Sequence, residues 1–211
     1  MTPFARTGSF TTSYLFIKRV RVIDILTAIK ERRSIHTFRK EEVPTTILEE
    51  IFTYGAWAPN HYMKEPWEIK IYQEHGKKTL VEAIILSYQR IGLIKENKDA
   101  KQTIQFISQF LLDIPHHALI HFKTSQNEIH YEEDYAAVCA FIQNSQLAAW
   151  KYGVGMLWTI TPYMHDHQFV TDIGLDSERD KIAAVMQIGY PEKIPKKRER
   201  TQIKEKLTFI S

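Results

Sequence analysis

Arg-Arg-Ser-Ile-His-Thr-Phe-Arg, residues 32–39, is the stretch from which the rest of this chain is best understood. It follows a segment whose apolar residues recur at helical spacing, and it gathers two guanidinium groups and a hydroxyl at three successive positions. A guanidinium presents a planar fork of donors that matches the oxygens of a phosphate. The stretch therefore predicts a phosphate-binding segment just after a helix.

A second informative block lies downstream, Ala-Pro-Asn-His-Tyr-Met-Lys-Glu-Pro-Trp at residues 58–67. It places a histidine and a carboxylate on a loop bounded by prolines, beside a tryptophan. Taken together, the two blocks suggest a bound organic anion that carries a polar ring, such as a flavin nucleotide.

In their order and spacing, the two blocks resemble the nitroreductase family of flavin-dependent oxidoreductases, in a form most similar to a compact single-domain branch. The matching residues are Arg32, Arg33, Ser34, Phe38, Ala58, Pro59, Pro66 and Trp67. The resemblance runs from about residue 23 to the C-terminus. We therefore expect residues 1–22 to be an N-terminal extension outside the core, and residues 23–211 to form one FMN-binding domain. The extension is basic and rich in Ser and Thr, a composition that a transit peptide can share.

The apolar pattern alternates between helical and strand-like segments along the chain. Helices are expected at 25–32, capped by Asp24, from Pro44 onward, at 77–88 and at 135–152, with a mixed helical stretch at 91–113. Strands are expected at 67–72, 118–122, 156–160 and 181–191, with a possible edge strand at 207–210. This order predicts an α+β domain around one central sheet.

The resemblance implies more about this architecture: a nitroreductase-like fold with a mostly antiparallel sheet flanked by helices, and an intertwined homodimer with an active site at each end of the interface. The stretch 135–152 is apolar nearly all round. That pattern fits a helix at a subunit interface, and it fits the core of a monomer equally well.

Composition narrows the classes of protein. The chain has 211 residues, of which 44% are hydrophobic and 25% charged, and its net charge of +3 does not by itself imply nucleic acid. The basic residues near the C-terminus lack the interleaved aromatics of a nucleic-acid surface. The one cysteine, Cys139, sits among apolar neighbours and is expected to be a buried core thiol. We expect a cytoplasmic protein with no membrane span, no nucleic-acid partner and no functional metal.

The resemblance assigns roles to the first block and its loop. Arg32, Arg33 and Ser34 are expected to bind the flavin phosphate and ribityl chain, although cations at a helix end also complement the helix dipole. His36 is expected either at the pyrimidine edge of the flavin or in solvent. In the loop, His61 and Glu65 are expected at the ring, where many relatives carry amides. An ionised Glu65 beside a reduced anionic flavin lowers the reduction potential.

Two further segments match the family. After Gly153-Val154-Gly155, the residues Trp158, Thr159 and Ile160 are expected to lie along the flavin, although a helix cap followed by a strand explains the glycines as well. Near the C-terminus, the basic run 195–200 matches a segment that sends one arginine back to the phosphate. Either Arg198 or Arg200 is expected to do so, and the pattern does not separate them.

The function that the resemblance implies is FMN-dependent reduction of a small electron-poor acceptor, such as a nitroaromatic or a quinone, by NADH or NADPH in a ping-pong cycle. No protein side chain need act as a catalytic acid or base, because the flavin N5 carries the hydride. A non-catalytic flavin-binding or flavin-storage protein on the same fold is the alternative.

Overall fold

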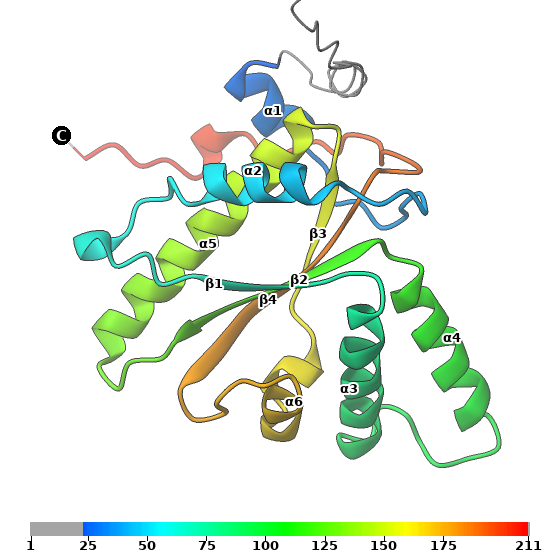
Figure 1. Ribbon diagram of the computed structural model, residues 1–211. Helices are drawn as coiled ribbons and strands as arrows, with labels where there is room; N and C mark the ends of the chain where they lie inside the picture. The colour runs from blue at the N-terminus through cyan, green and yellow to red at the C-terminus, as the bar shows by residue number, and fades with distance from the viewer. Residues whose placement is uncertain (1–22, 211) are drawn as a thin grey trace, which may run out of the picture.

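The computed structural model describes residues 23–210, which fold around one four-stranded antiparallel sheet (Figure 1). The strands lie in the order β1-β2-β4-β3. Their bounds are β1 Glu68–Tyr72, β2 His116–Lys123, β3 Gly155–Thr159 and β4 Asp180–Gly189. The two central strands, β2 and β4, are buried along nearly their whole length. Their middle residues, 118–120 and 182–186, are therefore apolar without interruption, because both faces of the sheet are covered.

Helices cover the two faces of the sheet in separate groups (Figure 1). One group comprises α1 Ile25–Glu31, α2 Thr45–Gly55 and α5 Glu128–Lys151, and the other comprises α3 Gly76–Arg90, α4 Ala100–Leu112 and α6 His167–Asp172. Short 3-10 turns complete the fold: η2 His61–Met63, η3 Pro162–His165 and η4 Ile203–Glu205. The expected α+β architecture is confirmed.

Alternation along β2 divides the interior into two cores. Ala118, Ile120 and Phe122 pack with α2 and α5 in one core, whereas Leu119 packs with α3 and α6 in the other. Successive side chains of a strand point to opposite faces, so a single strand can serve both layers. α4 belongs to the second core through Leu111, and the expected helical excursion at 91–113 is this helix.

The long helix α5 begins seven residues before the expected start at Tyr135. Asn127 caps it, since its side-chain oxygen accepts the backbone N–H groups of Ile129 (3.0 Å) and His130 (3.4 Å). The first two turns are rich in charge, so the apolar pattern does not extend into them. The polar cap, rather than the hydrophobic period, marks this helix start.

Two local expectations are wrong. Residues 207–210 form no strand, because the described C-terminal residues run outward with exposed side chains. Cys139 is half-buried rather than buried. Asp24 caps α1 as expected, accepting from the Thr27 N–H at 3.0 Å, and the apolar residues Ile25, Leu26 and Ile29 of this helix are exposed in the protomer.

Across residues 23–210, each helix falls short of the length and apolar character needed to cross a lipid bilayer.

Candidate functional site

Three arginines gather where α1 ends. Arg32 follows α1 directly and is half-buried, and both Arg33 and Arg200 lie close enough to act on its charge. Burial lowers the pKa of the Arg32 guanidinium, and repulsion from Arg33 and Arg200 lowers it further. Arg200, one of the two candidate arginines in the C-terminal segment, is thus near Arg32.

The cluster is short of negative charge. Among residues 23–210, Arg33 donates only to backbone carbonyls, those of Lys30 and Arg32, each at 2.7 Å. The Nε atom of Arg32 is buried and has no hydrogen-bond partner among residues 23–210. A buried donor without a partner costs about 1–3 kcal/mol, and more when it is charged. The donor set and the excess positive charge suit a phosphate group.

The segment after the arginines lies against β3. Ser34 forms a parallel bridge with Met156, and the Ile35 N–H donates to the Met156 carbonyl at 3.2 Å. Ile35 is completely buried, so the alternation of an extended backbone leaves Ser34 and His36 exposed on either side of it. The hydroxyl and the imidazole are thus available to a ligand that lies over the arginines.

The three predicted residues around β3 have different environments. Trp158 is half-buried, and its indole N–H is buried without a partner in the described part of the chain. The Thr159 hydroxyl donates to the Val185 carbonyl at 2.6 Å, so this side chain is already used within the sheet. Ile160 follows the strand and is 59% exposed. Trp158 and Ile160 are therefore the members of this set whose side chains remain free to contact a ring.

The second block forms a strained, exposed loop between α2 and β1. Tyr62, Met63 and Glu65 all have positive φ, between 45° and 53°. The Asn60 side-chain oxygen accepts the Glu65 N–H at 2.9 Å and closes the loop. His61 is exposed, stacks on Tyr62 with ring centroids 4.0 Å apart, and contacts Glu133 of α5 at 2.9 Å.

The fold does not bring this loop to the arginines within one protomer. The loop contacts the first turns of α5 at Glu133, whereas α1 lies beside the last turns of α5, near Leu147 (Figure 1). The fourteen positions between residues 133 and 147 span roughly 21 Å of helix. The two blocks that are neighbours in sequence are thus separated along the length of α5.

Sequence reasoning missed two features of this region. Glu133 and Asp134 hold the loop, but they precede the expected start of the long helix, and only the capping Asn127 signals that they are helical. Gly155 is the second. An added Cβ there would lie 2.4 Å from Cγ1 of Ile35, so the arginine segment can approach β3 only because this position is glycine.

Comparison with known proteins identifies the family that this chain matches. The family described as "Nitroreductase family" matches residues 29–190. The Bacillus subtilis (strain 168) protein named "Putative NAD(P)H nitroreductase YfhC" is 32% identical over 183 residues, which cover 85% of this chain and 91% of that protein. Iodotyrosine deiodinase of Hydra vulgaris is 26% identical over 190 residues, covering 81% of this chain and 66% of that protein.

Solved structures show the same fold. The crystal structure of a nitroreductase-like family protein from Bacillus cereus superposes with a TM-score of 0.82 at 36% identity, covering 90% of this chain and 97% of that one. The FMN-dependent nitroreductase NfnB from Mycobacterium smegmatis, solved with NADPH, gives a TM-score of 0.65 at 17% identity, covering 87% and 96%, and shows a common fold alone. On the family match and the Bacillus relatives together, this chain belongs to the nitroreductase family.

Proposed function

We propose that this protein is an FMN-dependent oxidoreductase that uses NADH or NADPH to reduce small electron-poor acceptors such as nitroaromatics or quinones. The observation that carries the proposal is the arginine cluster, where Arg32, Arg33 and Arg200 converge and a buried Arg32 donor lacks a protein partner among the described residues. Family membership and the FMN and NADPH named for NfnB support the same cofactor and reductant here.

In this proposal the chain binds and orients, and the flavin supplies the hydride chemistry when it is bound. Arg32, Arg33 and Arg200 hold the phosphate, and Ser34 donates to the phosphate or ribityl chain. His36 lies toward the pyrimidine edge. Trp158 and Ile160 pack along the ring, and Thr159 acts through its backbone because its hydroxyl is used within the sheet. His61 and Glu65 contact the ring from the loop.

The separation of the two blocks supports a homodimer in which each flavin site is shared. If two α5 helices pack antiparallel across a two-fold axis, the first turns of one helix lie beside the last turns of the other. The His61 loop of one protomer then lies beside the Arg32 cluster of its partner. A two-fold interface uses the same patch on both copies, so two equivalent sites result.

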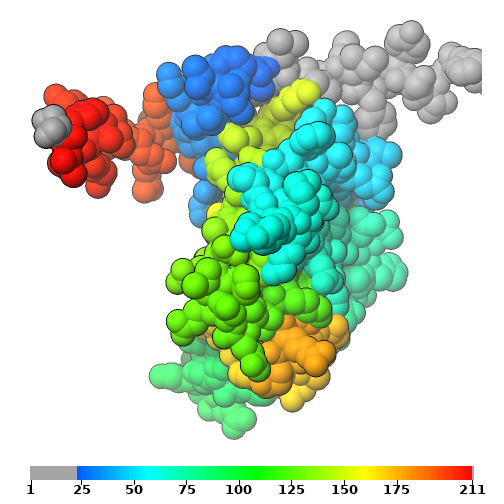
Figure 2. Space-filling view, turned by 90° about the vertical axis from the view of Figure 1, so that its left-hand side faces the viewer, coloured from blue at the N-terminus to red at the C-terminus, as the bar shows by residue number. Residues whose placement is uncertain are grey.

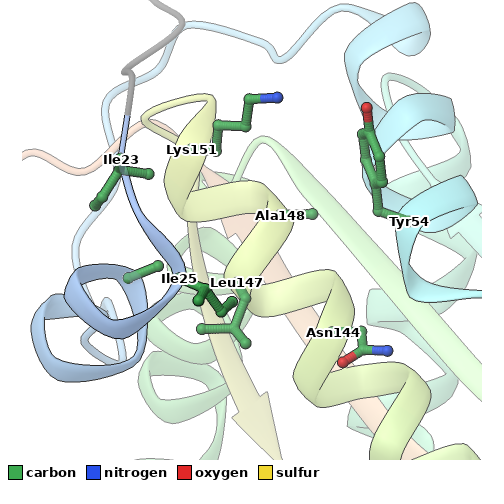
Figure 3. Close-up of a pocket in the computed structure, with 8 residues that line it drawn as sticks. Ile23, Ile25, Tyr54, Asn144, Leu147, Ala148 and Lys151 are labelled. Carbon is green, nitrogen blue, oxygen red and sulfur yellow. The ribbon is translucent and has the colours of Figure 1, made fainter. Parts of the chain in front are cut away.

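The exposed apolar surface is arranged for such a partner. A hollow of about 270 Å³ lies between α1, α2 and α5 (Figure 3). Ile25 and Leu147 meet at one side of it, and Lys151 lies 5.6 Å from the centre of the Tyr54 ring at the other. The C-terminal residues stand away from the body (Figure 2), and Leu207, Phe209 and Ile210 are exposed on them. A second copy would cover these surfaces, since an isolated chain leaves them in water.

The binding step is tested by titrating FMN into the apoprotein and into two matched variants, Arg200→Gln and Arg198→Gln. Loss of one charge-assisted contact predicts roughly tenfold to hundredfold weaker binding for Arg200→Gln. Arg198→Gln removes the same charge two residues away and should change the dissociation constant less than about twofold. Equal effects of the two variants would contradict the assignment of Arg200, and an apoprotein that takes up no FMN would overturn the proposed function.

The reaction is tested by adding NADH or NADPH anaerobically to the FMN-loaded protein. Bleaching of the oxidised flavin bands, followed by their return when a quinone or nitroaromatic is added, is the expected result. Bands that persist with both nucleotides would instead support a flavin-binding or flavin-storage protein on this fold.

A further inference from the structure

The loop at residues 60–65 is held in a conformation that its own sequence does not favour. Three of its residues, Tyr62, Met63 and Glu65, occupy the left-handed region without being glycine. Such conformations cost on the order of 1 kcal/mol each and persist only where surrounding contacts impose them. The contacts of this loop with its surroundings therefore decide where its side chains lie.

Two adjacent acidic residues on α5 supply those contacts. Glu133 Oε2 lies 2.9 Å from Nδ1 of His61, and Asp134 Oδ2 pairs with Nζ of Lys64. Asp134 is only 4% exposed, so its carboxylate is withdrawn from water and relies on the lysine for its charge partner. Loop residues 61 and 64 are thus attached to consecutive positions of one helix, and the strained residues 62 and 63 lie between the two attachments.

The Glu133 contact is shared with a second histidine. His130, one turn earlier on α5, places its Nδ1 3.3 Å from the same Glu133 oxygen. Hydrogen bonds from His61 and then His130 lower the pKa of the Glu133 carboxyl. Within the described residues no group of three His, Cys, Asp or Glu side chains is arranged to hold a metal ion.

We propose that Glu133 and Asp134 are positioning residues, which act through His61 and Lys64 to hold the flavin-ring loop in its strained, binding-competent conformation. This inference rests on the proposed FMN-binding function. The two attachments differ in kind, because Glu133 meets two imidazoles whereas Asp134 meets the ammonium group of one lysine.

The test compares Glu133→Gln and Asp134→Asn with Glu132→Gln, an exposed neighbour that makes no ion pair with any described residue. FMN dissociation constants are measured by flavin fluorescence at one pH for all variants. We expect roughly threefold to tenfold weaker binding for Glu133→Gln and Asp134→Asn, and an unchanged constant for Glu132→Gln. The ratio of each constant to the wild-type constant isolates the protein contact.

Melting temperatures measured beside the dissociation constants separate positioning from a general loss of structure. A positioning residue should weaken FMN binding while the melting temperature stays close to that of Glu132→Gln. Should Asp134→Asn lower the melting temperature strongly, Lys64→Gln removes the same pair from its exposed side. The inference would be overturned if Glu133→Gln and Asp134→Asn changed the FMN dissociation constant no more than Glu132→Gln does.

A second readout needs no flavin. Amide hydrogen exchange of the apoprotein, followed on peptides spanning residues 59–66, should be faster in Glu133→Gln and Asp134→Asn than in Glu132→Gln. This measurement keeps the two proposals distinct. If the wild-type protein binds FMN but exchange is unchanged in Glu133→Gln and Asp134→Asn, only the positioning role is wrong. If exchange is faster in these variants but the wild-type protein binds no FMN, only the proposed function is wrong.

Discussion

A missing side chain at Gly155 controls how closely the arginine segment approaches the sheet. A Cβ added at this position would lie 2.4 Å from Cγ1 and 2.9 Å from Cβ of Ile35, and 3.0 Å from Cγ of Pro191. Ile35 is fully buried and cannot move aside without opening the core. One residue without a side chain therefore allows Ser34 to pair with β3 and places Arg32 and Arg33 beside it.

Gly155→Ala is expected to destabilise the fold by about 1–3 kcal/mol, as overpacked interiors do, and to weaken FMN binding because the arginine segment shifts. Gly76→Ala is the matched control. No atom lies within 4 Å of its added Cβ, and alanine favours the helix that begins there, so stability should be unchanged or rise by about 0.5–1 kcal/mol. Urea unfolding of both variants measures the difference, and equal midpoints would show that the close approach does not constrain the chain.

At the scale of elements, β2 carries a pair of buried histidines in opposite roles. His116 Nε2 accepts the Val43 N–H at 2.9 Å, so its proton must sit on Nδ1, whereas His117 Nε2 donates to the Leu111 carbonyl at 2.9 Å. Burial lowers the pKa of each imidazole to about 4, and Lys77 adds to the effect. A charged His116 could no longer accept from Val43, so the strand is built for neutral imidazoles.

These pKa values predict acid sensitivity. In the folded protein the pKa of each imidazole, about 4, lies below the ordinary histidine value of 6.5. The unfolded chain therefore takes up protons first, so the fold is fully stable above about pH 6.5 and loses stability as the pH falls toward 4. Between those limits each imidazole lowers the free energy of unfolding by roughly 1.4 kcal/mol per pH unit. His116→Gln keeps an acceptor for Val43 and should remove the share of this slope that His116 contributes, measured by urea unfolding at several pH values.

His165→Gln provides the control, because this histidine is exposed and its removal takes no buried imidazole from the fold. If the free energy of unfolding depends on pH as steeply in His116→Gln as in His165→Gln, then protonation of His116 does not destabilise the protein.

At the scale of the whole molecule, the outward side of α5 is the surface on which the proposed dimer depends. Ala136, Ala140, Asn144 and Leu147 recur at helical spacing along that side, and the last two line the hollow beside α1. Small side chains let two helices approach closely. In the proposed dimer this side meets its copy, and each flavin then lies between the arginines of one protomer and the loop of its partner.

Ala136→Glu should convert the dimer to a monomer and release FMN together, because it places like charges at the interface while the exposed position tolerates a glutamate in the isolated protomer. Gln102→Glu, on the exposed side of α4, introduces the same charge elsewhere and should preserve both properties. Light scattering after gel filtration measures mass, and flavin absorbance measures occupancy. A monomeric variant that retains FMN would contradict the shared site.

The sequence by itself determined the α+β class, the strands and most of the helices. Each element carries its period in adjacent residues, and Asp24 marks the start of α1 as expected. The family, too, could be read from the two blocks around Arg32 and Trp67. Local pattern failed at the start of α5, whose first turns are polar, and at residues 207–210, where a strand needs a neighbour that no local pattern specifies.

Only the tertiary structure decided which distant residues meet. It brings Arg200 near Arg32, attaches the loop to Glu133 and Asp134, and separates the two blocks along α5. It also leaves the apolar residues of α1 exposed in the protomer. The physical reason is the same in each case. Periodicity reports which side of an element is apolar, whereas contacts between segments far apart in sequence depend on how all the elements pack together.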